Sequence, residues 1–505
     1  MSARDANLHA PRLEARDVAV LDVGSNSVRL VIYRLEGRAI WTVYNEKVLA
    51  GLGREVTRTG RLSPEGVETA LFALRRFKAV LDAARPAQVY TAATAAVREA
   101  EDGRAFIRRV RDETGLDIRI LSGEAEARAS AFGVMAGDPQ AVGVVGDLGG
   151  SSLELTRIEA GKAGRGVTLP LGPFALGAGK DYDPLKARAE AQRRLEPVSG
   201  RFTAHTFHAV GGAWRNLALL QMRLTGYPLH VVHQYVLSAS EALEVARLVA
   251  RQSRGSLERI QGVSKKRLET LPHAAVLMEA LVEQLHFEQV AFSAFGVREG
   301  LLFEAMTEEL RARDPLIEGC AAMGVRFGVA EDLGPALEVW LAPAFDDIDS
   351  AFTLERDRVM LAAAARLADL GARLHPDHRA ALVFEQVLRA PLAGQTHAER
   401  AFLAVAVYSR YDSDPALPES AVIQRVLSPE GLHRARALGL ALRLGADLSG
   451  RSPTLLRQSS LAVTAKAVRL TAQPKSADIL FGEQTRKRLA ALAAHLERDA
   501  VAEPA

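Results

Sequence analysis

The chain has 505 residues, too many for a single hydrophobic core, and this length predicts about three domains. Its apolar and charged contents, 48% and 25%, are those of an ordinary globular protein, and a net charge of +3 does not by itself indicate a polyanion partner. The single cysteine, Cys320, excludes an intramolecular disulfide and argues against a thiolate metal site and for a reducing compartment. No apolar run reaches the roughly 18 residues of a membrane span, so we expect a cytoplasmic protein without a membrane partner.

The N-terminal residues 1–17 are polar, lack the apolar centre of a signal peptide, and are expected to be flexible. Three strands rich in branched and aromatic residues should follow, at Val18–Val23, Val28–Arg34 and Ile40–Tyr44. Ser63 is a good N-cap and Pro64 suits the first position of a helix that runs to about Ala84.

Two short strands, at Gln88–Ala93 and Ile118–Leu121, should each lead into a helix. The first of these helices opens at a turn of small residues that contains Arg98, and the second is capped by Ser122 and carries Glu126. The turn signal Gly-Asp-Pro then ends the first predicted domain, residues 18–136.

The second predicted domain, residues 137–313, also begins with strands and then alternates strands with helices. Its expected strands are Val142–Asp147, Leu153–Ile158, Gly166–Leu171, His208–Gly212 and Val290–Ala294. Its expected helices are Lys186–Leu195, Ser240–Arg251, Ser264–Thr270, Ala274–Leu285 and Arg298–Arg313. The alternation up to residue 313 favours an α/β fold. Residues 314–505 are expected to be mostly helical, with one strand-like stretch at Leu461–Ala472.

An internal repeat links the two predicted domains. Asp22–Tyr33 reads DVGSNSVRLVIY and Asp147–Ile158 reads DLGGSSLELTRI, with Asp, Gly, Ser and Leu at the same offsets after an apolar run. Glycine lets a backbone approach a ligand closely and point its N–H groups at phosphate oxygens. The repeat therefore predicts two related half-domains, each presenting a phosphate-binding turn to a shared cleft. Because a strand and not a helix follows each turn, the dinucleotide fingerprint and the Walker loop do not fit.

The C-terminal region is more basic than the rest of the chain. Ala421–Ala505 contains 13 Lys and Arg against 7 Asp and Glu, a net charge of +6. Such a region could attract a long anion electrostatically, and a solvated helix face explains it equally well.

Taken in order, the motifs DVGSNSVRL, ATAAVREA, SGEAEAR, DLGGSSLEL, VGG and SAFGVREGLL resemble the exopolyphosphatase/guanosine pentaphosphate phosphohydrolase (Ppx/GppA) family, across residues 18 to about 310. That family belongs to the actin-like superfamily of sugar kinases and heat-shock ATPases. The resemblance implies two ribonuclease-H-like lobes with a central cleft. It further implies a mostly helical C-terminal region related to a degenerate metal-dependent phosphohydrolase domain of the His-Asp (HD) class.

The resemblance also implies roles for individual residues. Phosphate oxygens would be held by the two turns, Gly24, Ser25, Asn26, Ser27 and Gly149, Gly150, Ser151, Ser152. Glu126 matches the catalytic glutamate that activates water, although Ala125 stands where an acid is usual and Glu124 comes one position earlier. Arg98 matches a phosphate-gripping arginine, with an ion pair to a neighbouring carboxylate as the alternative.

Asp147 and Glu154 look like the family's Mg²⁺ ligands, since a hard cation that bridges carboxylate and phosphate is the usual arrangement. Arg298 and Glu299 are expected to form a structural ion pair between the lobes. The glycine pair at the end of the HAVGG strand is followed by Trp214, which could stack on a nucleotide base but is expected to fill space instead.

The C-terminal region departs from a working His-Asp metal site. Ala368 precedes Asp369 where the pair should stand, and the stretch Tyr408–Tyr411, YSRY, has no histidine. We therefore expect no second catalytic centre there, but a scaffold, a dimer surface or a guide for a polymer.

These observations predict an exopolyphosphatase that removes terminal phosphate from inorganic polyphosphate with Mg²⁺. A guanosine pentaphosphate (pppGpp) phosphohydrolase of the same chemistry is the nearest alternative. A kinase or ATPase of the superfamily and a non-catalytic sensor of polyphosphate or an alarmone are more distant ones. The resemblance implies a homodimer, and no feature of the sequence points to a nucleic-acid partner.

Overall fold

The computed structural model describes residues 15–178, 182–252, 255–256, 270–414 and 416–505. The chain divides into two units, of which one ends at Arg313 and the other begins at Asp314. The expected helix at residues 264–270 lies outside the described residues except for its last position, as does most of the expected flexible segment 1–17. We describe the two units separately.

The first sheet of the N-terminal unit has the strand order β3-β2-β1-β4, in which only β1 and β4 are parallel. Its strands are β1 (Arg16–Val23), β2 (Val28–Glu36), β3 (Ala39–Val48) and β4 (Gln88–Ala93). The strand at Ile118–Leu121 is reduced to a single bridge between Ala93 and Ile120, so that prediction was wrong in extent.

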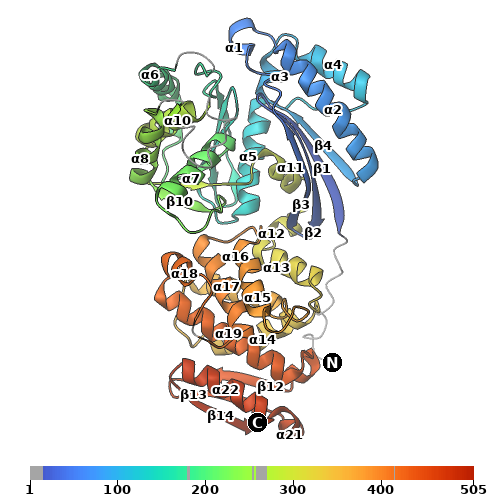
Figure 1. Cartoon of the computed structure of the whole chain (residues 1–505), viewed down its shortest axis with the longest axis vertical. Coiled ribbons are helices and arrows are strands. Elements are labelled where there is room, and N and C mark those ends of the chain that lie inside the picture. Colours follow the sequence, from blue (N-terminus) through green and yellow to red (C-terminus); the bar gives the residue numbers. More distant parts are fainter. Residues whose placement is uncertain (1–14, 179–181, 253–254, 257–269, 415) are drawn as a thin grey trace. The chain divides into compact units, whose positions relative to one another are not determined.

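Side chains of β1 alternate between two cores, as the period of a strand requires. Ala19 and Leu21 pack with one core cluster, whereas Val18 and Val20 pack with another. The first cluster lies under the helices on the outer face of the sheet (Figure 1), which are α1 (Val56–Thr59), α2 (Pro64–Ala84), α3 (Ala95–Glu99) and α4 (Gly103–Thr114). Ser63 caps α2 as predicted, its hydroxyl accepting from the N–H of Gly66.

A second sheet follows, in the order β10-β11-β9-β5-β6-β7, with a further strand, β8, also paired to β6. Its strands are β5 (Gly143–Leu148), β6 (Leu153–Glu159), β7 (Lys162–Ala163), β8 (Val167–Leu169), β9 (Thr206–Val210), β10 (Tyr235–Ser238) and β11 (Gln289–Phe292). Its helices are α6 (Pro184–Leu195), the 3₁₀ helix η1 (Glu196–Arg201), α7 (Gly212–Leu224), α8 (Ala239–Ala250) and α10 (Leu271–Leu285). The short strand β10 was not predicted, because its four residues alternate too briefly to stand out.

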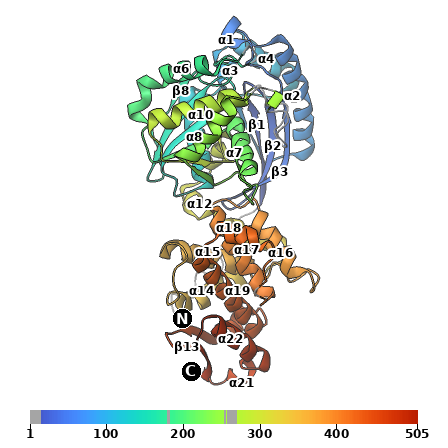
Figure 2. The same ribbon diagram turned by 60° about the vertical axis from the view of Figure 1, so that its left-hand side comes forward.

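Helices α5 (Gly123–Gly137) and α11 (Val297–Glu304) lie together between the two sheets (Figure 1), whereas Figure 2 brings α7, α8 and α10 of the second lobe to the front. They approach so closely that a Cβ at Gly300 would stand 1.7 Å from the carbonyl oxygen of Ala129, and one at Gly133 would stand 2.2 Å from that of Gly296. The long helix expected at Arg298–Arg313 is in fact two helices, α11 and α12 (Glu308–Ala312). Glycine at these contacts therefore fixes α5, which carries Glu126, against α11.

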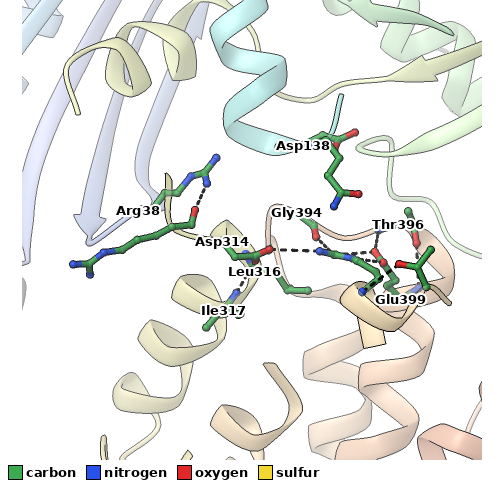
Figure 3. Close-up of polar contacts among 12 residues, drawn as sticks. Arg38, Asp138, Asp314, Leu316, Ile317, Gly394, Thr396 and Glu399 are labelled. Atoms are coloured by element: carbon green, nitrogen blue, oxygen red, sulfur yellow. Dashed lines mark hydrogen bonds and ion pairs between the residues drawn. The ribbon is translucent and has the colours of Figure 1, made fainter. Parts of the chain in front are cut away.

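The C-terminal unit is mostly helical, as expected. It contains α13 (Pro315–Arg326), α14 (Leu333–Phe345), α15 (Leu354–Leu367), α16 (Arg379–Arg389), α17 (His397–Tyr411), α18 (Ser420–Val426), α19 (Pro429–Ser449), α20 (Pro453–Leu456), α21 (Ala477–Leu480) and α22 (Glu483–His495). Figure 3 shows how it begins: the carboxylate of Asp314 accepts from the N–H groups of Leu316 and Ile317, at 2.8 and 3.2 Å. This is an N-cap, and the proline that follows suits the first helical position.

The strand-like stretch predicted at Leu461–Ala472 is two strands of a small sheet. The sheet has the order β12-β13-β14, with β12 (Ser459–Val463) antiparallel to β13 (Ala467–Ala472) and β14 (Asp499–Pro504) parallel to it. Sequence reasoning did not find β14, which lies at the end of the chain. No helix among the described residues is both long and apolar enough to cross a bilayer.

Candidate active site

The repeated sequence forms the same turn in both lobes. In the first lobe the N–H of Gly24 donates to the carbonyl of Ser27 at 2.9 Å, and in the second the N–H of Gly149 donates to the carbonyl of Ser152 at 3.0 Å. Each turn joins two antiparallel strands, β1 to β2 and β5 to β6. The internal repeat in the sequence is thus an internal repeat in the structure.

The repeat extends to a second loop in each lobe. Gly51 donates its N–H to the carbonyl of Asn26 at 3.1 Å, and at the matching position Gly172 donates to Ser151 at 3.0 Å. Two residues further along each loop, the N–H of Gly53 donates to the carbonyl of Ser25 at 2.8 Å. In the second lobe, the N–H of Phe174 donates to the carbonyl of Gly150 at 2.9 Å. These backbone hydrogen bonds attach each loop to its turn. Sequence reasoning missed the two loops, although each has a glycine just after the strand pattern ends.

Both turns line one cleft of the N-terminal unit. Of the predicted site residues, those that line the cleft are Gly24, Ser25, Asn26, Ser27, Glu126, Asp147, Gly149, Gly150 and Ser152. Three others, Arg98, Ser151 and Glu154, are not among the residues that line it. Sequence reasoning did not place Asp22, Arg29, Lys47, Thr94 or Arg215 at the cleft, although all five line it. Asp22 and Arg29 stand inside the repeated segment, so the repeat itself could have indicated them.

Glu126 lies in the first turn of α5 and is only 5% exposed. Ser122 caps that helix by accepting from the N–H of Ala125, which leaves the Glu126 side chain to face the cleft. Burial raises the pKa of the Glu126 carboxyl to about 7; Arg98 opposes this rise, and Asp147 and Asp22 add to it. A carboxyl with a pKa near neutrality can accept a proton at physiological pH. Glu124, the alternative position, lies on the exposed side of the helix.

Arg98 contacts Glu126 directly. Its Nη1 lies 2.7 Å from Oε2 of Glu126 and also donates to the carbonyl of Leu121 at 3.1 Å. Glu99 is more distant, with its Oε1 3.7 Å from Nη2 of Arg98. The structure therefore shows the ion pair of Arg98 with Glu126 and gives the arginine a role in holding that carboxylate, while its Nη2 is buried without a hydrogen-bond partner.

Asp147 and Glu154 are directly opposite each other in the antiparallel pairing of β5 and β6, so their side chains share one face of the sheet. Ser130, one turn after Glu126 on α5, donates its hydroxyl to Oδ2 of Asp147. Burial raises the pKa of both carboxyls, and for Glu154 the charges of Glu126 and Asp147 raise it further. Two buried carboxylates on one face of a sheet repel each other, and a cation between them would relieve this repulsion.

These two residues fit a magnesium ion better than a metal that needs an all-protein cage. Oε1 of Glu154 is buried without a hydrogen-bond partner, which leaves an oxygen ready for a cation. Mg²⁺ is usually bound by one or two carboxylates, with waters and substrate phosphates completing the shell. No group of three or more His, Cys, Asp or Glu side chains in the described part of the chain is arranged to hold a metal.

The two lobes differ in charge at one matching position. Arg29 lies opposite Asp22 in the first lobe, where the second lobe has Glu154 opposite Asp147. Arg29 is also the cross-strand neighbour of Lys47, and both line the cleft. Arg29 and Lys47 therefore give the first lobe a basic wall beside Asp22, and the second lobe has an acid at the position that matches Arg29.

Arg298 and Glu299 form the expected ion pair, with Nε of Arg298 3.9 Å from Oε1 of Glu299, and each also contacts the first lobe. Nη1 of Arg298 lies 3.2 Å from Oδ2 of Asp22 in the first lobe. Glu299 accepts from the hydroxyl of Tyr33 at 2.6 Å and from the N–H of Gly296 at 2.9 Å. Arg298 also lines the cleft, so it is placed to meet a ligand as well as to connect the lobes.

Trp214 is fully buried and belongs to the core of the second lobe, not to the cleft. Its Nε1 donates to the carbonyl of Ala274 at 3.0 Å, and its ring packs edge-on against Phe207. The space-filling role expected from the sequence is the one observed. No aromatic side chain of the described residues lines the cleft, so it offers no stacking surface for a base.

Two lobes built on related sheets, each with a phosphate-type turn at a shared cleft, define a mixed α/β protein with an actin-like fold. Residues 31–309 match the Ppx/GppA phosphatase family and residues 340–500 match the family described as "Exopolyphosphatase, C-terminal". The chain therefore belongs to the Ppx/GppA phosphatase family.

Individual relatives agree with this assignment. The chain is similar to exopolyphosphatase 1 of Mycobacterium tuberculosis, with 26% identity over 311 residues, which are 58% of this chain and 89% of the relative. Among solved structures, a Ppx/GppA family member from Aquifex aeolicus aligns with a TM-score of 0.51 at 24% identity, covering 58% of this chain and 97% of the other. An exopolyphosphatase from Cytophaga hutchinsonii aligns with a TM-score of 0.53 at 20% identity, covering 58% and 99%. These structural likenesses support the fold.

Proposed function

We propose that the protein is an exopolyphosphatase, which hydrolyses the terminal phosphoanhydride bond of inorganic polyphosphate. The observation that carries this proposal is the placement of Glu126, a buried carboxyl with a pKa of about 7, in a cleft between two phosphate-type turns. Backbone N–H groups and hydroxyls of the turns would hold the terminal phosphate. The basic wall of Arg29 and Lys47 would meet the following phosphates.

In the proposed reaction, Glu126 accepts a proton from water as the water oxygen bonds to the terminal phosphorus. The bridging P–O bond breaks, its electron pair stays with the shortened chain, and orthophosphate leaves. Arg98 holds the Glu126 carboxylate in place from behind the cleft, through the 2.7 Å contact. A positioned base of this kind contributes roughly 10²–10⁴-fold. Mg²⁺ bound by Asp147 and Glu154 would supply charge neutralisation for the phosphate oxygens.

Hydrolysis of pppGpp is the alternative that uses the same chemistry. The absence of an aromatic side chain from the described cleft lining and the burial of Trp214 favour a chain of phosphates over a nucleotide. Specificity constants measured side by side on long polyphosphate and pppGpp separate the two, and a higher constant for pppGpp would overturn the proposed substrate. A sensor without turnover is tested in the same assay, since it would release no phosphate.

The direct test of the mechanism is phosphate release by Glu126→Gln, which keeps the shape of the side chain and removes the base. We expect kcat to fall at least 100-fold, in line with the range for a general base. Glu124→Gln is the matched control, because it changes the neighbouring exposed acid of the same helix. If Glu124→Gln lost activity and Glu126→Gln kept it, the base would have been misassigned.

We also propose a homodimer formed through the C-terminal unit and a cytoplasmic location. Exposed apolar side chains such as Val339 and Leu354, 76% and 51% exposed, support an interface on that unit. The lone, buried Cys320 suits a reducing compartment. Light scattering of the wild type and of Val339→Asp tests the first proposal, and cell fractionation tests the second.

The C-terminal unit is proposed to be a degenerate relative of HD-type phosphohydrolases. Asp369 lies where the His-Asp pair would stand, and the structure brings it close to Arg410 of the YSRY stretch, 3.7 Å from Nη2. The guanidinium of Arg410 therefore lies beside Asp369, where a metal ion would need histidine ligands. Metal analysis of the purified full-length protein should therefore find no bound transition metal.

A further inference from the structure

Two acidic residues from separate segments of the C-terminal unit flank one buried guanidinium. Arg410, at the end of α17, has a side chain that is 4% exposed and lies 3.7 Å from a carboxylate oxygen of Asp369 on one side and of Asp447 on the other. Both distances are too long for hydrogen bonds. The Nε atom of Arg410 is buried without a hydrogen-bond partner. This guanidinium is thus surrounded by protein but poorly satisfied by it.

Both carboxylates already have closer partners. Nε of Arg451 lies 2.8 Å from Asp369, and Nε of Arg488 lies 2.9 Å from Asp447. The acids beside Arg410 are therefore shared with other arginines. Within the described residues, the cluster holds more positive than negative charge.

A fourth arginine adds to the excess. Arg443 precedes Asp447 by one turn of α19, and its Nη1 is buried without a hydrogen-bond partner. Burial lowers the pKa of Arg443, and the neighbouring charges of Arg488 and Arg410 lower it further, whereas Asp447 and Asp412 oppose this. Arginine nevertheless stays charged in proteins. Partly buried like charges and unpaired N–H groups in one place favour binding of an anion that can accept several hydrogen bonds.

We propose that Arg410, Arg443, Arg451 and Arg488, the arginine cluster, bind a phosphoryl group. The planar fork of a guanidinium matches the oxygens of a phosphate, which would accept the N–H groups that Arg410 and Arg443 leave unpaired. The site is open to solvent at its edge, where the side chain of Arg451 is 47% exposed, and the buried N–H groups of Arg410 and Arg443 would turn outward to meet a ligand. It belongs to the C-terminal unit and does not depend on the chemistry of the cleft.

The phosphoryl group can come from an inorganic chain or from a nucleotide, and the test separates these sources. Full-length protein with Glu126→Gln, which suppresses turnover, is titrated by calorimetry with inorganic tripolyphosphate and, separately, with GTP. The same titrations are run after adding Arg443→Gln, and after adding Arg358→Gln as the matched control. Arg358 is an arginine of the same unit whose side chain is 62% exposed and lies 3.3 Å from the carboxylate of Asp346.

We expect a binding event that weakens at least tenfold with Arg443→Gln and is unchanged with Arg358→Gln. Arg410→Gln should weaken binding as well. Because Arg410 is the more buried residue, the melting temperature of this variant is also measured. If Arg410→Gln does not fold, Arg443→Gln decides the outcome. If the affinity depends on Arg443 for tripolyphosphate but not for GTP, the ligand is an inorganic chain. If the affinity for GTP depends on Arg443 equally, the site binds nucleotide phosphates. If no binding event of either probe depends on Arg443, the cluster is a structural ion network and the proposal is wrong.

Discussion

Replacement of Arg98 by methionine separates two roles for this residue, one on Glu126 and one on substrate. The pKa of Glu126 is about 7 because burial raises it while Arg98, 2.7 Å away, holds it down. An opposite charge within hydrogen-bonding range shifts a carboxyl by roughly 1–3 pKa units. The side chains of Arg98 and Glu126 are 19% and 7% exposed, so solvent screens this pair only weakly.

In Arg98→Met, the pKa of Glu126 should therefore rise to roughly 8–10. The base is active when deprotonated, so a higher pKa leaves less active enzyme at a given pH. At pH 7 the deprotonated fraction would fall from about one half to between about 10% and 0.1%, and kcat/KM by roughly 5- to 500-fold. Activity should recover as the pH is raised, because the acidic limb of the profile has moved and not disappeared.

The assay is orthophosphate release from long polyphosphate between pH 6 and 10, with kcat/KM taken at each pH. Arg98→Lys keeps the charge and should leave the limb near its original position. Arg58→Met, which loses only a surface ion pair with Glu55, is the matched control. A fall in kcat/KM of equal size at every pH, with the limb unmoved, would refute the reasoning and make Arg98 a substrate contact.

Three further changes test other parts of the site. Glu126→Gln should stabilise the fold at pH 8 but not at pH 4. The carboxyl has a pKa of about 7 in the folded protein and 4.5 when free, so its ionisation lowers the free energy of unfolding by up to ~3 kcal/mol as the pH rises between these values. Melting temperatures of the wild type and the variant at the two pH values check this. Gly300→Ala places a Cβ 1.7 Å from a carbonyl oxygen of α5 and should cost ~1–3 kcal/mol or more in urea unfolding, whereas Gly200→Ala, with nothing within 4 Å, should cost little. Ser130→Ala removes the hydroxyl donor to Asp147 and should weaken Mg²⁺ binding measured by calorimetry, with Ser130→Thr restoring it; unchanged affinity in Ser130→Ala would show that the hydrogen bond does not position the carboxylate.

The parts of the fold that the sequence predicted well are those where pattern and turn chemistry agree. Ser63 before Pro64 identified the start of α2, and the apolar runs before Asp22 and Asp147 identified β1 and β5. Ile118–Leu121 has the composition of a strand but forms only one bridge, because strand pairing depends on a neighbour that composition does not reveal. The same limit hid β14, which pairs in parallel with β13 over residues that carry no alternating pattern.

The candidate site was predicted where it lies in one segment and missed where it is assembled from several. Glu126 and the two turns are local motifs, and the structure brings them to one cleft. Lys47 and Arg215 reach that cleft from a strand and a helix that no local spacing connects to it. The distinction between Arg98 as a phosphate contact and as a partner of Glu126 also required coordinates, because both need the same residue type at the same position.

The internal repeat explains how the cleft can bind phosphate symmetrically and yet react with it on one side. The turns at Gly24 and Gly149 have the same hydrogen bond, so each lobe offers the same kind of cradle. Seven residues after the aspartate of each repeat, however, one lobe has Arg29 and the other has Glu154. A cation at this position of the first lobe would attract the phosphate chain, whereas the carboxylate at the matching position of the second would help to hold a metal ion. Arg29→Gln removes that cation without burying a charge, and we expect the variant to keep the fold and to raise KM for polyphosphate. An unchanged KM would show that the asymmetry at this position does not direct the substrate.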